Sequence, residues 1–420
     1  MSYIVIGNSA AGLFAVEAIR KHDAQSKIIV LTAENEPSYS RCLTTYFLAG
    51  DIPASSLYLR EKGFAERLNL TVVYGVEVNW IDPERQLIHG TDGREWSYRK
   101  LLLAMGASAN KLTIPGGDLP EVFTLRTMQD ALAINAVLKQ GAQKSVVIGG
   151  GLVSLKCAYA LRKRGLEVTV LISSGQLLSQ MLDSKAASML QRHLEANGLR
   201  FLLQTEALAI TGTDHVQGVL LANKTELVAD IVIVGKGVQP NIGNLRDFGF
   251  NIGLGVRVDS SLATSIPNIY AAGDIAETWD LARQKFTVNA TWPNATTQGR
   301  IAGANMSGGH EVYPGSLGLN SVDFFGLSAM SAGITKLPED KGQGDWNQEE
   351  HHKMVGDLPI YRNLIWQGDI LKGFVLVGDT SQCGVLTALV KAGRPLTQAQ
   401  KKLSMGKRGT LAVGMMNSEK

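Results

Sequence analysis

The sequence opens on a pattern that places a glycine-rich turn between an apolar run and a helical segment. Residues 3–6 are apolar, GNSAAG follows at residues 7–12, and 10–21 has the spacing of an amphipathic helix. A second apolar run lies at 27–31. This order predicts a βαβ unit, in which two parallel strands are joined by a helix.

The same pattern returns about 140 residues later. The apolar run 145–148 leads into GGG at 149–151, a helix is expected over 152–164, and a strand over 167–172. Two such units in one chain of 420 residues predict an α/β protein with two Rossmann-like dinucleotide-binding domains.

Composition excludes several other classes of protein. Hydrophobic residues make up 45% and charged residues 19%, and the 45 glycines fit a fold with many tight strand-to-helix turns. A formal net charge of +3 predicts neither nucleic-acid nor membrane binding. The start MSYIVIGNSAAG has no signal-peptide pattern, and we expect a cytoplasmic protein. Cys42, Cys157 and Cys383 have no metal-ligand spacing, so no metal site is expected and redox chemistry requires an organic cofactor.

The first glycine turn has the features of a pyrophosphate site. Gly7 permits the tight turn, Gly12 permits close packing of helix on strand, and Ser9 replaces the usual middle glycine. The helix N-terminus offers free N–H groups to the phosphates. Glu34 is the candidate acceptor for the ribose hydroxyls, although a surface carboxylate after a strand is an equally simple interpretation.

The second turn keeps the glycines that bind phosphate but lacks the residues that select a ribose. Gly149 and Gly151 are in place, with Ser154 where the third glycine is expected. At the end of the following strand Ile172 occupies the position of the usual carboxylate, and Ser173 is the nearest polar residue. The site is therefore expected to bind a dinucleotide without a stated preference for NADH or NADPH, the alternative being a vestigial fold.

Two further residues have both a chemical and a plain structural interpretation. Asp274 in GDIAE follows a buried strand, where it would bind a sugar-alcohol hydroxyl ahead of another helix or would simply cap that helix. Cys42 in SYSRCL lies at an expected helix start, where a thiolate is stabilised, or is only a small buried residue beside a cofactor.

Over residues 1–330 the motifs resemble those of the pyridine-nucleotide-dependent FAD oxidoreductases. The matching segments are GNSAAG, PSYSRC, LLLAMGA, GGGLVSLK, GVQPN, PNIYAAGDIAE and TWPNATTQGRIAG. Within this class the chain is most similar to the branch of rubredoxin and ferredoxin reductases, the flavin part of nitrite reductase, NADH oxidases and coenzyme A disulfide reductases. The segment 315–333 resembles the start of that branch's C-terminal interface domain.

The resemblance implies three domains and two cofactors. It assigns an FAD domain to 1–112 and 241–310, an inserted NAD(P)H domain to 113–240, and an α+β interface domain, expected to form a homodimer, to 311–420. The FAD contacts that it implies are Gly7, Ser9, Ala11, Gly12, Glu34, Arg41, Cys42, Ala107, Asp274, Trp292 and Thr297. The expected NADH or NADPH contacts are Gly149, Gly151, Leu152, Val153, Ser173 and Gly237.

The leading hypothesis is an FAD-dependent NAD(P)H oxidoreductase that exchanges electrons with a small iron–sulfur protein such as ferredoxin or rubredoxin. A second is an NADH oxidase or disulfide reductase with Cys42 as its catalytic residue. A third is a flavin electron-transfer subunit that does not bind NAD(P)H, because Lys156 stands where many relatives have a glutamate. The basic residues from Lys391 to Arg408 attract an acidic partner or form a solvated tail, and we expect poor packing from Lys401 onward.

Overall fold

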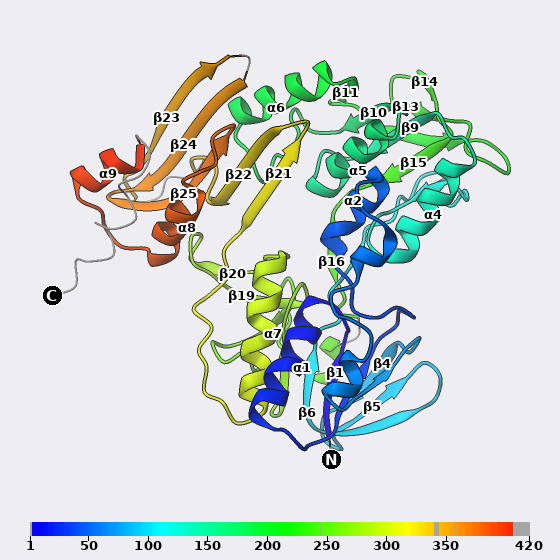
Figure 1. Ribbon diagram of the computed structural model, residues 1–420, viewed down its shortest axis with the longest axis vertical. Coiled ribbons are helices and arrows are strands. Elements are labelled where there is room, and N and C mark those ends of the chain that lie inside the picture. Colours follow the sequence, from blue (N-terminus) through cyan, green and yellow to red (C-terminus); the bar gives the residue numbers. More distant parts are fainter. Residues whose placement is uncertain (1, 244, 340–343, 357, 406–420) are drawn as a thin grey trace.

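The computed structural model describes residues 2–243, 245–339, 344–356 and 358–405. Three bodies are visible in Figure 1: a lower one that contains the N-terminus, an upper one made of the middle of the chain, and a third at upper left made of the C-terminal strands. The first two are built on mainly parallel sheets and the third on an antiparallel sheet. The predicted α/β class with two Rossmann-like units and a C-terminal α+β domain is confirmed.

The first sheet is formed by segments from both ends of the lower body. Its strand order is β3-β2-β1-β6-β5-β4, with β18 paired to the end of β6. β1, β2, β3 and β18 run parallel to their neighbours, whereas β4 and β5 form an antiparallel extension. The strands are β1 Ser2–Ile6, β2 Ile28–Leu31, β3 Leu70–Val73, β4 Val78–Asp82, β5 Leu87–Gly90, β6 Glu95–Leu103 and β18 Ile269–Ala271.

Two helices pack against each other beside this sheet, α1 Ala10–His22 and α7 Trp292–Met306 (Figure 1). Their close approach depends on two glycines of α7. A Cβ atom on Gly299 would lie 2.1 Å from the Ala11 carbonyl oxygen, and one on Gly303 would lie 2.3 Å from that of Ala15. Both positions therefore require glycine for backbone-to-backbone packing, which brings segments almost 300 residues apart into one layer.

The expected helix after Asp274 is wrong. Ala276 donates its N–H to the Gly273 carbonyl in a tight turn, and the chain continues as strand β19 Ala276–Asp280. β19 pairs with β17 Val256–Arg257 and β20 Lys285–Thr287, so tertiary pairing decides the local structure. Asp274 consequently caps no helix, and the helix near this end of the sheet is α7.

The second parallel sheet has the order β11-β10-β9-β15-β8. The predicted strand-helix-strand unit is present as β9 Lys144–Ile148, α5 Leu152–Lys163 and β10 Glu167–Ile172. The remaining elements of this body are β8 Val122–Phe123, α4 Met128–Lys139, α6 Ser184–Ala196, β11 Leu199–Leu203, β15 Ile231–Val234 and the small antiparallel sheet β12 Ala207–Thr211, β13 Gly218–Leu221 and β14 Glu226–Val228.

The chain passes between the two bodies through a pair of short antiparallel strands. β7 Ala107–Ala109 leads toward the second body and β16 Val238–Pro240 returns from it, with Ser108 opposite Gln239. The predicted boundary at 112 lies shortly after β7, and the one at 240 is the last residue of β16. Short elements that complete the first body are η1 Arg41–Leu43, α2 Thr44–Ala49, η2 Ala54–Leu57, α3 Phe64–Arg67 and η3 Leu245–Phe248.

The C-terminal sheet has the order β21-β22-β25-β24-β23, all antiparallel. Its strands and helices are β21 Leu319–Phe324, β22 Leu327–Gly333, β23 Trp346–Val355, β24 Leu358–Gln367, β25 Ile370–Val377, α8 Cys383–Ala392 and α9 Gln398–Met405. One face packs on the second body, because Phe324, Tyr361 and Val375 share a core with residues of α5 and α6. The other face has its own core with α8.

Lys401 does not fit the expected poorly packed tail. Its ammonium lies 2.7 Å from the Asp369 carboxylate and over the Trp366 ring. Residues 406–420, which include Lys407 and Arg408, lie outside the described residues.

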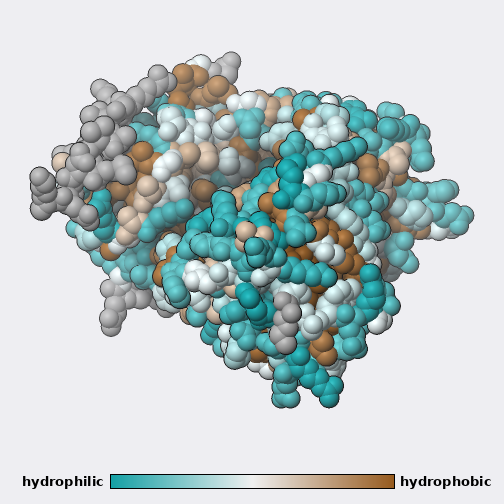
Figure 2. Space-filling model, turned by 60° about the horizontal axis from the view of Figure 1, so that its bottom comes forward, coloured by the Kyte–Doolittle hydropathy of each residue, from teal (hydrophilic) through white to brown (hydrophobic). Residues whose placement is uncertain are grey.

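The surface seen from the first body's side is mixed in character. Figure 2 shows a mostly hydrophilic face on which hydrophobic residues gather in limited patches. Among the described residues, no helix combines the length and the apolar content that crossing a bilayer requires.

Candidate functional site

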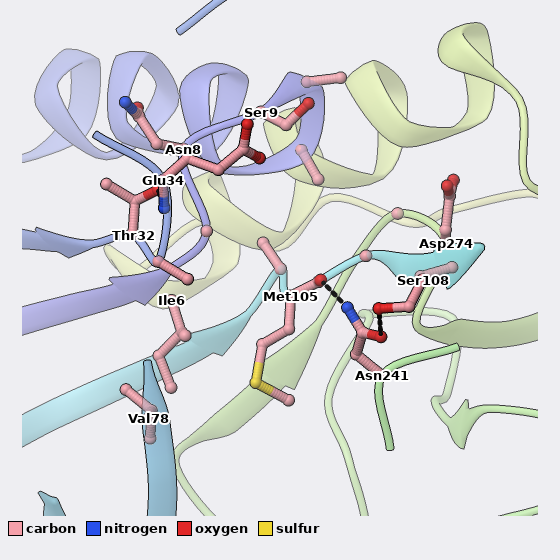
Figure 3. Close-up of a pocket in the computed structure, with 18 of the residues that line it drawn as sticks. Ile6, Asn8, Ser9, Thr32, Glu34, Val78, Met105, Ser108, Asn241 and Asp274 are labelled. Atoms are coloured by element: carbon pink, nitrogen blue, oxygen red, sulfur yellow. Dashed lines mark hydrogen bonds between the residues drawn. The ribbon is translucent and has the colours of Figure 1, made fainter. Parts of the chain in front are cut away.

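A cavity of about 570 Å³ lies at the carboxyl ends of β1, β2, β6 and β18, which is where ligands bind in open α/β sheets. This volume is within the usual range for small-molecule and cofactor sites. Figure 3 shows Ser9 and Glu34 at one side of the cavity and Ser108, Asn241 and Asp274 at the other. The site is therefore long enough to contact a ligand at two separated ends.

The first glycine turn forms one wall of the cavity. Gly7 has a φ of +115°, and a Cβ atom there would lie 2.1 Å from the Ala104 carbonyl oxygen. Ser9 precedes α1 but its side chain makes no capping hydrogen bond, and the first turn contains no acidic residue. The N–H groups at the start of α1 thus face the cavity, and they suit a phosphate group.

Glu34 lies beyond the end of β2 and is held by two neighbours. Tyr39 donates a hydrogen bond of 2.6 Å to its carboxylate, and Arg41 forms an ion pair with the other oxygen. The Tyr39 hydroxyl also accepts a hydrogen bond from the Met128 N–H at 2.9 Å. Burial raises the Tyr39 pKa above its ordinary value, so this hydroxyl stays protonated and donates to Glu34.

Asp274 lies at the opposite end and is paired with a residue that sequence reasoning missed. The Arg126 Nη2 atom is 2.8 Å from the Asp274 carboxylate, and its Nε donates to the Ala107 carbonyl at 2.9 Å. The Arg126 carbonyl in turn accepts from Arg41. Arg126 links the two ends of the cavity, yet no motif marks it, since its position depends on how the chain crosses between domains.

Asn241 ends the GVQPN segment but was not predicted as a site residue. Its Nδ2 donates to the Met105 carbonyl at 2.8 Å, and its carbonyl oxygen accepts from the Ser108 hydroxyl at 2.7 Å (Figure 3). These bonds join the strand that returns from the second body to the end of β6. The wall of the cavity at this point is therefore fixed by segments that enter and leave the inserted body.

Cys42 lines the cavity and is exposed to it. It lies in the short helix η1 rather than at the N-terminus of an α-helix. The surrounding protein raises its pKa through desolvation, which outweighs the lowering effect of Lys156 and Arg126, while Asp274 raises it further. Desolvation thus works against the thiolate of the first interpretation and favours the second, a thiol beside a cofactor.

Lys156 is a partly buried cation close to Cys42. It follows the first turn of α5, and no hydrogen bond or ion pair holds it among the described residues. Desolvation lowers its pKa, and Cys42 is the group that opposes this effect. A positive charge of the second body thus lies beside the cavity of the first.

The predicted FAD contacts are mostly brought together. Gly7, Ser9, Ala11, Glu34, Arg41, Cys42, Ala107, Asp274 and Trp292 line the cavity. Gly12 lies behind the turn, where a Cβ atom would be 1.9 Å from the Gly7 carbonyl oxygen. Thr297 lies further along α7 and does not line the cavity. The cradle at Gly7, the uncapped helix and the two paired carboxylates fit the pyrophosphate and hydroxyl groups of FAD.

The second glycine turn repeats the backbone geometry of the first. Gly149 has a φ of +123°, and a Cβ atom there would lie 2.4 Å from the Gly235 carbonyl oxygen. Gly151 precedes α5 without a capping side chain. Ser154 is buried and donates to the Gly235 carbonyl at 3.1 Å, so it takes the packing role of the expected glycine.

Beside this second turn, at the end of β10, the residue at position 172 carries no charged group that could select a ribose. Ile172 is 1% exposed. Its side chain packs against Gly150, and a Cβ atom added to that glycine would lie 2.9 Å from the Ile172 side chain. The other predicted contacts, Leu152, Val153, Ser173 and Gly237, are at least partly accessible. No group of three His, Cys, Asp or Glu side chains suited to a metal occurs within the residues that the structure describes.

Comparison with known proteins gives relatives over nearly the whole chain. The pattern of the family described as pyridine nucleotide-disulphide oxidoreductase matches residues 1–299. The assimilatory nitrate reductase electron transfer subunit of Bacillus subtilis (strain 168) is 30% identical over 95% of this chain and 50% of its own length. The chain thus spans only half of that relative.

Two further relatives match over most of their own length. The NADH-dependent phenylglyoxylate dehydrogenase subunit epsilon of Aromatoleum evansii is 34% identical over 80% of both chains. The rubredoxin-NAD(+) reductase of Ectopseudomonas oleovorans is 32% identical over 73% of this chain and 80% of its own. Among solved structures, a NAD-dependent persulfide reductase from A. fulgidus superposes with a TM-score of 0.89 at 29% identity, covering 97% of this chain and 79% of that one.

Proposed function

Because the chain belongs to the pyridine nucleotide-disulphide oxidoreductase family, whose members bind FAD and use NADH or NADPH, we propose that this oxidoreductase passes electrons between NAD(P)H and a small redox protein. The observation that carries the proposal is the pair of glycine turns with uncapped helices, one at Gly7 and one at Gly149. Each presents backbone N–H groups to a pyrophosphate, and they lie in adjacent bodies of one chain.

The residues of the first body would hold FAD along the cavity. The start of α1 would bind the pyrophosphate, Glu34 would accept hydrogen bonds from ribose hydroxyls, and Asp274 would accept one from the sugar-alcohol chain. Tyr39, Arg41 and Arg126 would hold both carboxylates in place through hydrogen bonds and ion pairs. FAD, when bound, supplies the acceptance of a hydride and the release of electrons.

The second body would bring the nicotinamide nucleotide to the Cys42 end of the cavity. α2 packs on α5, and Lys163 forms an ion pair with Asp51, so α5, which follows Gly151, is fixed against the first body. Lys156 on this helix would place a positive charge beside the reacting groups. A fixed cation in a poorly solvated site favours negative charge that develops during electron transfer.

A small redox protein is proposed as the acceptor because rubredoxin-NAD(+) reductase is among the relatives that match over most of their length. A cysteine-dependent mechanism has weaker support, because desolvation raises the pKa of Cys42 and so disfavours its thiolate. Replacement of Cys42 by Ser is therefore expected to leave flavin reduction and acceptor turnover unchanged.

The decisive experiment is an anaerobic titration of the FAD-loaded protein with NADH and, separately, NADPH. Bleaching of the flavin absorbance with either nucleotide, followed by reoxidation with rubredoxin or ferredoxin, is the expected result. Bleaching without reoxidation by either protein would reject the acceptor class alone. No bleaching with either nucleotide, in a protein that dithionite still reduces, would reject the NAD(P)H reaction.

That last outcome would favour a second candidate, a flavin electron-transfer subunit that receives electrons from a partner protein. The observations in its favour are the buried Ile172 at the ribose end of the second turn and the cation Lys156 near the cavity. Two of the relatives are named as subunits, which agrees with work inside a larger assembly.

A further inference from the structure

The loop that follows β10 lies beside the second glycine turn. It begins after Ile172, whose side chain packs against Gly150. It then returns to the same glycine, because the Leu178 N–H donates a hydrogen bond of 2.7 Å to the Gly150 carbonyl. In a unit of this kind the adenosine ribose lies at the end of the strand that follows the glycine turn. A nucleotide on this turn would thus have its ribose beside the first residues of the loop, Ser173 and Ser174.

One hydroxyl at the start of this loop is free. The Ser174 carbonyl accepts from the Gln204 N–H at 3.2 Å, and the Ser174 hydroxyl donates to the Gln176 carbonyl at 3.0 Å. Ser173 is exposed, and its hydroxyl forms no hydrogen bond with any described residue. The loop therefore keeps its shape without the Ser173 side chain, which is left available to a ligand.

The loop and the strand before it carry no charge. Residues 168–182 contain no Asp, Glu, Lys, Arg or His. Asp183, the next residue, is buried and accepts hydrogen bonds from Tyr361 and Asn363. Glu206, the first charged residue after β11, is exposed, so water and salt screen its charge. The loop thus offers neither a carboxylate to select the 2′-hydroxyl of NADH nor a cation to hold the 2′-phosphate of NADPH.

We propose that the second body accepts both NADH and NADPH, with affinities that differ by less than about tenfold, and that Ser173 lies beside the 2′ group that distinguishes them. This inference rests on the proposed function, because it requires that the second glycine turn binds a nicotinamide nucleotide. A serine hydroxyl donates to a phosphate oxygen, and it both donates to and accepts from a ribose hydroxyl. Ser173 therefore suits either group, whereas selection by charge requires a carboxylate that repels the phosphate or a cation that attracts it.

Ile172 does not have this role, although it ends the strand. It is 1% exposed and packs against Gly150, so a charged side chain at this position would be buried without a partner. Ser173 is exposed, and a carboxylate or guanidinium placed there reaches water. Position 173 is therefore where the chain can be made selective without disturbing the glycine turn.

The affinities are tested by calorimetric titration of the FAD-loaded protein with ADP-ribose and with 2′-phospho-ADP-ribose, in about 0.15 M salt. Both probes carry the pyrophosphate and the adenosine but no nicotinamide, so binding is measured apart from electron transfer. We expect both to bind, with dissociation constants within about tenfold of each other. Binding of one probe more than about tenfold tighter would overturn this inference and leave the proposed function standing. Binding of neither probe would overturn this inference and the NAD(P)H reaction together.

Two variants test the position of Ser173. Ser173→Asp should weaken binding of 2′-phospho-ADP-ribose by about tenfold or more, because the carboxylate repels the phosphate, and should retain binding of ADP-ribose. Ser173→Arg should tighten binding of 2′-phospho-ADP-ribose by about the same factor. Ser188→Asp and Ser188→Arg make the same changes at an exposed site of α6 and should alter neither affinity. An unchanged flavin-to-protein absorbance ratio shows that each variant is folded. Equal affinities in the 173 and 188 variants would overturn the assignment of Ser173.

Discussion

At the scale of single residues, the cavity depends on carboxylates that hydrogen bonds and ion pairs hold in place. Glu34 and Asp274 are each held by a cation or a phenol from another segment, and these partners come from positions as distant as Arg126. The strand-end carboxylate Glu34 could be located from periodicity alone. Its partners could not, because they depend on the chain crossing between two bodies.

The state of Cys42 gives the first prediction. Because desolvation raises its pKa above the ordinary value of about 9, less of it is thiolate at pH 8 than for a free cysteine. In a Cys383→Ser background, alkylation by iodoacetamide should be slow at pH 7 to 8 and should accelerate as the pH rises above 9. Cys157 is buried, so Cys42→Ser in the same background gives the baseline. A thiol that reacts fully at pH 6 to 7 would contradict this interpretation.

Gly149 gives the second prediction. Gly149→Ala forces a residue with a Cβ atom into a φ of +123° and against the Gly235 carbonyl, at a cost of about 1 to 3 kcal/mol. Affinity for NAD(P)H should fall about tenfold or more, measured by anaerobic titration, while the bound FAD spectrum stays unchanged. Gly175→Ala is the matched control, because a Cβ atom there meets nothing within 4 Å. Equal loss in both variants would show that the turn has no special role.

At the scale of elements, the contact between α1 and α7 fixes the wall of the first cavity. α7 contains the segment TTQGRIAGA. The sequence could indicate a helix there, but not that this helix packs on α1. The same limit explains the wrong expectation after Asp274. The local signal of a strand followed by Gly-Asp was read correctly up to the turn, and pairing of β19 with strands from elsewhere decided what followed.

Gly299→Ala tests this helix contact. The added methyl group would overlap the Ala11 carbonyl, so α7 must move away from α1 at a cost of about 1 to 3 kcal/mol. We expect a lower melting temperature and a lower flavin-to-protein absorbance ratio after gel filtration. Gly384→Ala in α8 meets no atom within 4 Å and should retain both values. Full retention of FAD by the Gly299 variant would mean that the cavity wall tolerates movement of α7.

At the scale of the whole molecule, the second body and the C-terminal sheet behave as one packed unit. They share a hydrophobic core, and Asp183 at the start of α6 is buried between them. Its carboxylate accepts hydrogen bonds from Tyr361 at 3.2 Å and from Asn363 at 3.0 Å, as well as from the Ala186 N–H. The motifs identified both bodies, but no motif predicted which faces meet.

Asp183→Ala should therefore destabilise both bodies together. It removes a helix cap and leaves two buried donors without an acceptor, which costs about 3 kcal/mol in the free energy of unfolding. Urea unfolding followed by circular dichroism should give a lower midpoint, with an unchanged value for the exposed control Asp214→Ala. Two separated transitions in the variant would mean that Asp183 couples the bodies. A single unshifted transition would mean that it contributes little.

The adjacent strands β7 and β16 have a consequence for how such a protein can be altered. The chain leaves the outer body and returns to it at one place, where Ser108 and Gln239 lie opposite each other. An inserted segment with neighbouring ends can be exchanged for another without changing the path of the chain around it. A segment grafted between these two strands would have to carry its own equivalent of Arg126, because this residue of the inserted segment pairs with Asp274 in the first cavity.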